Sequence, residues 1–220
     1  MRIDTSDPGD FETRAAGWLE HIRSHTPPRP HLRPRRGRCA LLVIDMLRYF
    51  ADPAGRCYLP WSEPAVPRIA ALLAAWRSDG APVFFTRHAH EGEHDLGMLG
   101  TFFSDYIRAG EPESEIIAPL APLEGETVMR KTTYDAFLGT GLEEKLRTTD
   151  CDQIVIAGVL THMCCATTAR SAFCRGFEVY LPADATASST EQFHISALLT
   201  LADSVAVLLS TDEILAAISG

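Results

Sequence analysis

Short runs of apolar residues alternate with longer amphipathic stretches along most of this chain. The runs are almost continuously hydrophobic, as strands covered on both faces must be. Six strands are predicted in this way, at residues 39–46, 82–87, 127–131, 153–159, 177–184 and 204–210. Between them, apolar residues recur at the spacing of one helix face. This spacing predicts five helices, at residues 65–78, 141–148, 163–175, 191–202 and 212–218.

The alternation of strands and helices predicts an α/β fold. We expect a three-layer αβα, doubly wound, Rossmann-like sheet of about six mainly parallel strands. Functional sites in such sheets form at the carboxyl ends of the strands. The alternation is interrupted between Arg87 and Thr127 by a stretch that is too long for a plain connector. We expect this stretch to fold over the strand ends as a binding lid.

The first 38 residues differ from the rest of the chain. A short helix is predicted at residues 10–25. The apolar residues along one side of this helix are Phe11, Ala15, Trp18, Leu19 and Ile22. The proline- and arginine-rich stretch TPPRPHLRPRRGR follows, and it excludes regular structure. We interpret residues 1–38 as an extension that packs on one domain formed by residues 39–220, and the basic stretch as a solvated loop.

Composition narrows the classes of function. The 220 residues are 46% hydrophobic and 22% charged, which is enough apolar material for one substantial core. The net charge of -9 disfavours binding to nucleic acid or to an anionic membrane. No apolar run approaches the roughly 18 to 20 residues that cross a bilayer, and the start of the chain has no signal-like pattern. We therefore expect small-molecule partners and a cytoplasmic location.

Reactive side chains occur where three of the predicted strands end. Asp45 closes the first strand, Lys131 closes the third, and Cys164 opens the helix after the fourth. Because the carboxyl ends of parallel strands share one edge of the sheet, we expect these side chains to lie within about 5 Å of one another.

Lysine is rare in this chain, which contains only Lys131 and Lys145. An ammonium group can change its protonation state or hold an acid and a thiolate together, whereas a guanidinium group cannot lose its proton. The alternative is that Lys131 extends from the strand end into solvent. Both interpretations stay open from this feature alone.

Cys164 differs from the other five cysteines in its position. The six cysteines show no paired spacing, so reduced thiols are expected, and most of them suit an inert core role. Cys164 lies at a helix N-terminus, where unpaired amides favour a thiolate. We therefore expect an alkylating reagent to label Cys164 first, because the other cysteines should be buried. Cys165, rotated by roughly 100° about the helix, should point into the core.

Three blocks of this sequence resemble one family of enzymes. LLVIDM, KTTYDAFLGTGLEEKL and QIVIAGVLTHMCCATTARSAFCRGFEVYLPADAT are similar to the isochorismatase-like hydrolases, which include isochorismatases, nicotinamidases, carbamoylsarcosine amidases and ureidoacrylate amidohydrolases. The resemblance implies that Asp45 is the general acid/base, Lys131 its charge partner and Cys164 the nucleophile. It also implies a cis peptide bond between Val159 and Leu160, with the amides of Leu160 and Cys164 as oxyanion donors.

The chain departs from the family pattern at two places. The first block usually continues as D-x-Q, but Leu47 stands where the glutamine is expected. Nicotinamidases carry an Asp-x-His metal-binding pattern after the second strand, whereas this chain has His88, His90 and His94 without the matching aspartate. We predict no metal and no organic cofactor.

The resemblance also gives candidates for substrate contacts. They are Phe50, Arg87, His88, Tyr134, Phe137 and His162, with Arg87 as a possible partner of a substrate carboxylate. Phe50 and Phe137 could equally be core aromatics, and Arg87 could pair with an acid of the lid.

The predicted activity is hydrolysis of a small amide or ureido substrate through a cysteine thioester. Some isochorismatases have glycine where Cys164 stands and use the aspartate to protonate a vinyl ether, and this chain resembles them in His162. Vinyl ether hydrolysis of a chorismate-derived acid is therefore the first alternative. A non-catalytic binding protein on the same fold is the second. The family is commonly oligomeric, so a homo-oligomer is expected.

Overall fold

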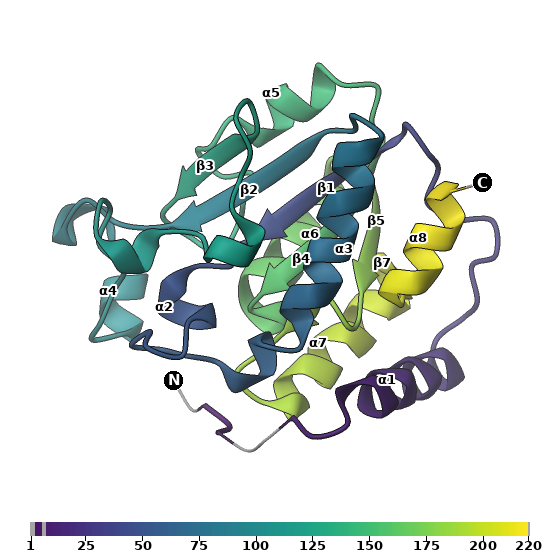
Figure 1. The fold of residues 1–220 in the computed structure, drawn as a ribbon, viewed down its shortest axis with the longest axis horizontal. Coiled ribbons are helices and arrows are strands. Elements are labelled where there is room, and N and C mark those ends of the chain that lie inside the picture. The colour runs from purple at the N-terminus through teal and green to yellow at the C-terminus, as the bar shows by residue number, and fades with distance from the viewer. Residues whose placement is uncertain (1–2, 6–7, 220) are drawn as a thin grey trace.

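A seven-stranded sheet forms the centre of the molecule, and all pairings between its strands are parallel (Figure 1). The structure is a computed structural model that describes residues 3–5 and 8–219. The strand order is β3-β2-β1-β4-β5-β7, and the short β6 pairs with β4. The strands are β1 (Cys39–Ile44), β2 (Val83–His88), β3 (Thr127–Lys131), β4 (Gln153–Val159), β5 (Glu178–Pro182), β6 (Thr186–Ala187) and β7 (Ala206–Leu209).

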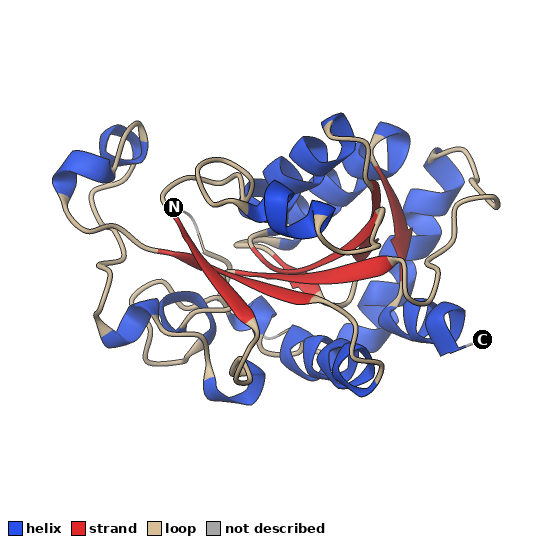
Figure 2. Cartoon of the chain, turned by 90° about the horizontal axis from the view of Figure 1, so that it is seen from above, coloured by secondary structure: helices blue, strands red, loops and turns tan. Residues whose placement is uncertain are grey.

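The predicted doubly wound fold is confirmed, with one strand more than expected. Each of the six apolar runs contains a strand. The additional strand, β6, has only two residues, which is too short to produce a recognisable pattern. Helices lie on both faces of the sheet, as Figure 2 shows. The helices are α1 (Phe11–His25), α2 (Arg48–Ala51), α3 (Ala65–Ser78), α4 (Leu99–Phe102), α5 (Leu142–Arg147), α6 (Ala166–Cys174), α7 (Glu191–Ser204) and α8 (Thr211–Ser219).

The central strand β1 divides the core into two apolar layers. Leu41 and Val43 belong to the layer that contains residues of α3 and α8. Leu42 and Ile44 belong to the layer that contains residues of α5, α6 and α7. Successive side chains of a strand point to opposite faces, so a strand buried on both faces must be apolar at every position. All six residues of β1 are buried, as the continuous apolar run predicts.

The helix predicted at residues 163–175 has a different start. A π-helical turn, η5 (Thr161–Cys165), follows β4 directly, and α6 begins only at Ala166. The first three residues of the predicted helix belong to this turn, so Cys164 lies inside the turn. Turns of this kind are rare and occur frequently at functional sites.

The N-terminal helix α1 covers the side of the molecule formed by α7 and α8 (Figure 1). Its five predicted apolar residues are all buried, and Asp10 caps its N-terminus by accepting a hydrogen bond from the Thr13 amide. Arg14 contacts Glu191 of α7 at 2.6 Å, and Arg23 contacts Glu213 of α8 at 2.7 Å. The apolar side of α1 therefore packs against the core, with ion pairs at its edges.

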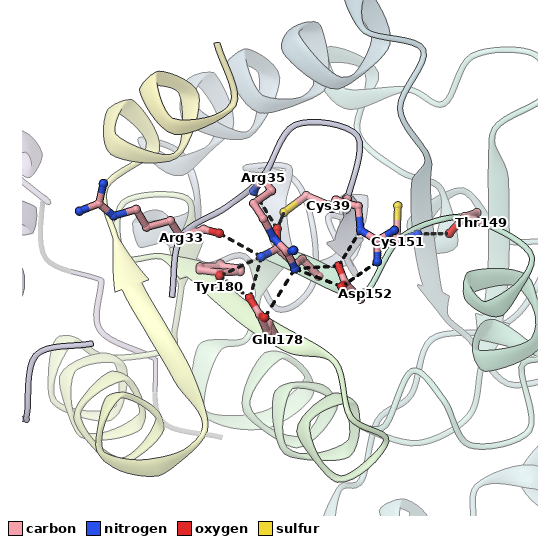
Figure 3. A network of polar contacts seen from close by, with 10 residues as sticks. Arg33, Arg35, Cys39, Thr149, Cys151, Asp152, Glu178 and Tyr180 are labelled. Atoms are coloured by element: carbon pink, nitrogen blue, oxygen red, sulfur yellow. Dashed lines mark hydrogen bonds and ion pairs between the residues drawn. The ribbon is translucent and has the colours of Figure 1, made fainter. Parts of the chain in front are cut away.

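The arginines of the following stretch are used within the chain itself. Arg35 and Arg38 contact the Asp152 carboxylate at 3.1 and 2.8 Å. The Gln153 amide donates to the Arg33 carbonyl at 2.9 Å and to Glu178 at 2.6 Å. Figure 3 shows this network at the amino ends of the strands. The basic stretch is thus the exposed loop that its composition suggested, and its arginines also anchor the linker to the domain through surface ion pairs.

The long connection between β2 and β3 spans residues 89–126. It contains α4 and three short 3₁₀ turns, η2 (Glu93–Asp95), η3 (Pro112–Ser114) and η4 (Ala118–Leu120). Leu47 and Ile116 form an isolated antiparallel bridge, which ties the connection to the chain after β1. In the described part of the chain, no helix is long and apolar enough to cross a membrane.

Candidate functional site

Asp45 lies directly after β1 and is fully buried. Its backbone has φ = +48°, an uncommon conformation that aspartate tolerates better than most residues. Thr86 of β2 fixes its orientation, since the Thr86 hydroxyl accepts from the Asp45 amide at 3.1 Å and donates to Oδ1 at 2.7 Å. The second carboxylate oxygen, Oδ2, is left facing the third strand.

Lys131 ends β3, and its side chain is completely buried against Asp45. Its Nζ lies 2.6 Å from Asp45 Oδ2 and 3.2 Å from Cys164 Sγ, and it donates to the Thr133 carbonyl at 2.9 Å. The interpretation that this side chain extends into solvent is therefore wrong. The ammonium group instead links the acid to the thiol.

Cys164 lies in the turn η5 and is 5% exposed. The peptide bond between Val159 and Leu160, which precedes this turn, is cis, as the family resemblance implied. Cys165 is fully buried in the apolar layer that contains α6, which confirms its predicted packing role. The three strand ends therefore bring Asp45, Lys131 and Cys164 together in the expected geometry.

The charges of these groups follow from their surroundings. Burial opposes ionisation of Asp45, but Lys131 and His88, together with hydrogen bonds from Lys131 and Thr86, outweigh it and lower the pKa of Asp45. Burial would also lower the pKa of Lys131, but Asp45 and the Cys164 sulfur raise it above its ordinary value. At neutral pH, Asp45 and Lys131 form a buried ion pair.

Cys164 rests as a thiol and not as the thiolate that its helix position suggested. Burial raises the pKa of Cys164 to about 12, although Lys131 acts in the opposite direction. The expected order of alkylation is also wrong in its premise, because Cys174 is exposed and Cys57 is half-buried. An exposed thiol meets a reagent more readily than a buried protonated one, so we expect Cys174 to be labelled before Cys164.

A chain of hydrogen bonds leads from Lys131 through two histidines. Lys131 Nζ lies 3.3 Å from His88 Nδ1, and His88 Nε2 lies 3.1 Å from His90 Nε2. His90 Nδ1 then donates to the Asp95 carbonyl at 3.1 Å. Because Lys131 can only donate, His88 Nδ1 accepts and its Nε2 carries the proton. Burial, followed by the charge of Lys131, lowers the pKa of His88 to about 3, so this ring is neutral.

This arrangement bears on metal binding. Asp45, His88 and Cys164 offer ligand atoms within 4.8 Å of one another among the described residues. The Lys131 ammonium lies between them, within 3.3 Å of each, and therefore already supplies a cation at that position. The two facing histidines use all their ring nitrogens in the hydrogen-bond chain. In this arrangement the Lys131 ammonium occupies the position between these three ligand atoms, and the exposed His94 is not part of the group.

Cys164 lies on the wall of a cavity of about 240 Å³. The predicted contacts Phe50, His88 and Tyr134 line this cavity, as does Leu160. The long connection 89–126 supplies another wall, consistent with its predicted position over the strand ends. The lining residues from this connection are His90, Leu96, Leu99, Gly100, Phe102, Phe103, Ser104, Asp105, Tyr106 and Ile107.

Three predicted substrate contacts lie outside this cavity lining. Phe137 is buried in the core, where its ring is 6.2 Å from that of Phe177. His162 points to Ser188, to which its Nδ1 is hydrogen-bonded, and stacks on Phe193 at 4.8 Å. Arg87 precedes His88 on β2, so its side chain points to the opposite face of the sheet. The structure thus gives these three residues no direct contact with a molecule in the cavity.

Two residues that hold the reactive side chains in place were not predicted from the sequence. Thr86 orients the acid, and the only signal for it was a hydroxyl residue directly after three buried apolar positions of the predicted strand. The Thr133 carbonyl, which accepts from Lys131, left no signal in the sequence because any residue has a carbonyl. Both contacts depend on how neighbouring strand ends meet.

The buried neutral histidines predict a strong loss of stability in mild acid. Burial lowers the pKa of His88 to about 3 and that of His194 to about 4, whereas both would titrate near 6.5 in the unfolded chain. Below about pH 6.5 these two histidines bind protons in the unfolded chain but stay neutral in the folded chain. We expect the free energy of unfolding to fall by about 1.4 kcal/mol per pH unit for each histidine, down to about pH 4.

Urea denaturation at pH 6.5, 5.5 and 4.5 measures this slope. His88→Gln and His194→Gln should each remove about half of it, because each variant lacks one of the two protonation sites. A slope that is unchanged in both variants would show that other groups cause the acid sensitivity.

The sequence and the fold of this chain are both similar to those of known proteins. Residues 39–213 match the family model described as the isochorismatase domain. The chain is 38% identical over 178 residues to nicotinamidase 3 of Arabidopsis thaliana, covering 80% of this chain and 86% of that protein. It is 31% identical over 180 residues to a probable isochorismatase of Pseudomonas chlororaphis, covering 80% and 84%. The crystal structure of a cysteine hydrolase from Pseudomonas syringae pv. phaseolicola 1448A superposes with a TM-score of 0.82 at 28% identity, covering 88% of this chain and 98% of that one.

Proposed function

Because the chain belongs to the isochorismatase family, we propose that it hydrolyses the amide or ureido C–N bond of a small non-peptide substrate through a thioester on Cys164. One observation carries this proposal. The Cys164 sulfur lies 3.2 Å from Lys131 Nζ, which pairs with Asp45 at 2.6 Å, beside a cavity that the sulfur itself lines. A nucleophile, a proton acceptor and a fixed cation thus converge where a substrate can enter.

The protonation states define the first half of the proposed reaction. Cys164 begins as a thiol and Asp45 as a carboxylate. As the sulfur attacks the substrate carbonyl, its proton passes to Asp45 and the carbonyl oxygen becomes an oxyanion. The backbone amides of Leu160 and Cys164 are the proposed donors to that oxygen. Lys131 remains charged throughout and stabilises the sulfur as it gives up its proton.

The second half returns the site to its starting state. The tetrahedral intermediate collapses, the C–N bond breaks, and Asp45 gives its proton to the departing nitrogen. A water molecule then attacks the thioester and transfers one proton to Asp45. The C–S bond breaks, the carboxylic acid is released, and Asp45 returns the proton to the Cys164 sulfur.

The lining of the cavity favours an uncharged substrate. Of the described residues that line it, none is lysine or arginine, and most are aromatic or aliphatic. The Asp105 carboxylate is already bonded to the Tyr49 hydroxyl at 3.0 Å and to Arg56 at 3.1 Å. A substrate carboxylate would enter without a cationic partner and would lose its hydration. We infer that an amide with a neutral, flat acyl group fits best.

Vinyl ether hydrolysis is the second candidate, supported by the similarity to the probable isochorismatase. That reaction requires an acid that can protonate carbon. Here Lys131 and Thr86 help to hold the pKa of Asp45 below its ordinary value, so the resting carboxylate carries no proton to give. Thioester formation on Cys164 needs an ionised Asp45 to accept the thiol proton. The ion pair of Asp45 with Lys131 therefore favours thioester formation over vinyl ether hydrolysis.

Rapid quenching followed by mass spectrometry tests the proposal. The protein is mixed with neutral aromatic amides, small ureides and dicarboxylic vinyl ethers, and quenched in acid within milliseconds to seconds. We expect an acyl adduct on the peptide that contains Cys164, together with release of ammonia or amine, from one of the neutral amides or ureides. Turnover of a vinyl ether without any adduct would overturn the proposal.

A further inference from the structure

The turn that contains Cys164 is hydrogen-bonded to a buried histidine of α7, His194. Thr161, the first residue of η5, is fully buried, and His194 is 3% exposed. The Thr161 hydroxyl lies 2.8 Å from His194 Nδ1. His194 Nε2 lies 3.2 Å from the Ala183 carbonyl, which can only accept. Nε2 therefore carries the ring proton, and Nδ1 accepts from Thr161.

The ring of His194 is in turn positioned by the N-terminal helix. The Trp18 ring packs against it edge to face, with 4.6 Å between centroids and an interplanar angle of 62°. Trp18 is itself fixed, because its Nε1 donates to Glu191 at 2.8 Å and Arg14 holds the same carboxylate at 2.6 Å. Trp18 is 5% exposed, so this contact belongs to the core.

These contacts form one path from α1 to the reactive turn. Trp18 contacts His194, His194 bonds Thr161, and Thr161 lies between Leu160, which lines the cavity, and Cys164. Trp18 lies outside residues 39–213, which match the family model. The extension therefore reaches the site through side chains and not only through general packing.

We propose that Trp18 and His194 are positioning residues for the reaction. They hold Thr161, and through it they set where the Cys164 sulfur lies relative to Lys131. The inference rests on the proposed function in that its main measurement is amide hydrolysis. A shift of about 1 Å in a reacting group can cost as much as 100-fold in rate, so a loosened turn should lower kcat without weakening substrate binding.

The experiment uses pairs of variants in the full chain. Thr161→Val removes the hydroxyl at nearly constant volume, and Thr161→Ser retains it. Trp18→Ala removes the ring, and Trp18→Phe retains an aromatic edge against His194. Ile22→Ala is the matched control, because it deletes another buried side chain one turn further along α1.

We expect Thr161→Val and Trp18→Ala each to lower kcat about tenfold, with KM changed less than about twofold. Thr161→Ser and Trp18→Phe should stay within about threefold of the parent. The double variant Trp18→Ala/Thr161→Val should lose little more than either single variant, because both act along one path. Ile22→Ala should lower the melting temperature comparably and leave kcat near that of the parent.

A second measurement separates this inference from the proposed function. The alkylation rate of Cys164 relative to that of exposed Cys174, measured by peptide mass spectrometry, reports the position of the sulfur without any substrate. We expect this ratio to change at least about threefold in Thr161→Val and Trp18→Ala. If no amide is hydrolysed but the ratio changes, the proposed function fails and the inference stands. An unchanged ratio together with unchanged kcat, or equal losses in Ile22→Ala, would overturn the inference.

Discussion

Cys164→Ala should abolish amide hydrolysis, lowering kcat by at least about 10⁴-fold, while the protein remains folded. The variant keeps the ion pair of Asp45 and Lys131 but has no atom that can form the thioester. Cys165 cannot replace it, because Cys165 is fully buried and does not line the cavity. Steady-state assays on the amide that forms the adduct, together with circular dichroism, measure the two outcomes.

Cys165→Ala is the matched control for this variant. The same sulfur is removed one residue later, but from the core and not from the cavity wall. We expect kcat to stay within a fewfold of the parent and the free energy of unfolding to fall by about 1 kcal/mol, because the change leaves a small cavity. Equal activity of Cys164→Ala and the parent would exclude covalent catalysis. Asp45 would then be the remaining proton donor, and vinyl ether hydrolysis would become the better explanation.

The convergence of Asp45, Lys131 and Cys164 could be predicted because each lies at or just after the carboxyl end of a parallel strand. In a parallel sheet the carboxyl ends of all strands lie along one edge. β1, β3 and β4 belong to the same sheet, so the residues that follow or end them meet at that edge. The rarity of lysine left two interpretations open. Burial decided between them, and burial is a property of packing that no local pattern contains.

The charge state of Cys164 could not be predicted for the same reason. Its place near a helix start and a lysine suggested a thiolate, and both features are present. The turn is buried more deeply than the sequence indicated, so desolvation outweighs them and raises the pKa of Cys164 to about 12. A site that keeps its nucleophile protonated until the substrate enters reacts less readily with other electrophiles.

The substrate contacts were predicted less well than the reactive residues. Arg87 and His88 are adjacent in sequence, but β2 continues through both and turns their side chains to opposite faces. His162 and Phe137 matched family motifs, yet they bond and stack within the protein. The residues that do line the cavity come largely from the connection 89–126, whose path is set by long-range contacts such as the bridge between Leu47 and Ile116.

Lys131→Arg should fold but lose most of its activity, with kcat/KM reduced by about 10² to 10³-fold. The ammonium group meets Asp45, Cys164, His88 and the Thr133 carbonyl within 3.3 Å, in a space with no exposure. A planar guanidinium is larger and presents its donors in one plane, so it cannot face partners that surround a single point. The chain's other lysine, Lys145 on α5, supplies the control, since Lys145→Arg should leave kcat/KM unchanged.

A second substitution at Lys131 tests the effect of its charge separately from the effect of its shape. Lys131→Met removes the cation and leaves Asp45 as an unpaired buried carboxylate, so we expect a loss of about 3 to 5 kcal/mol in the free energy of unfolding. The double variant Asp45→Asn/Lys131→Met removes both charges and should recover most of that stability without recovering activity. Denaturant titrations measure the stability of Lys131→Arg, Lys131→Met and the double variant, and amide assays measure their activity. Near-normal turnover in Lys131→Arg would mean that the reaction needs only a positive charge near Cys164, and the compact geometry of the ammonium would have no role in it.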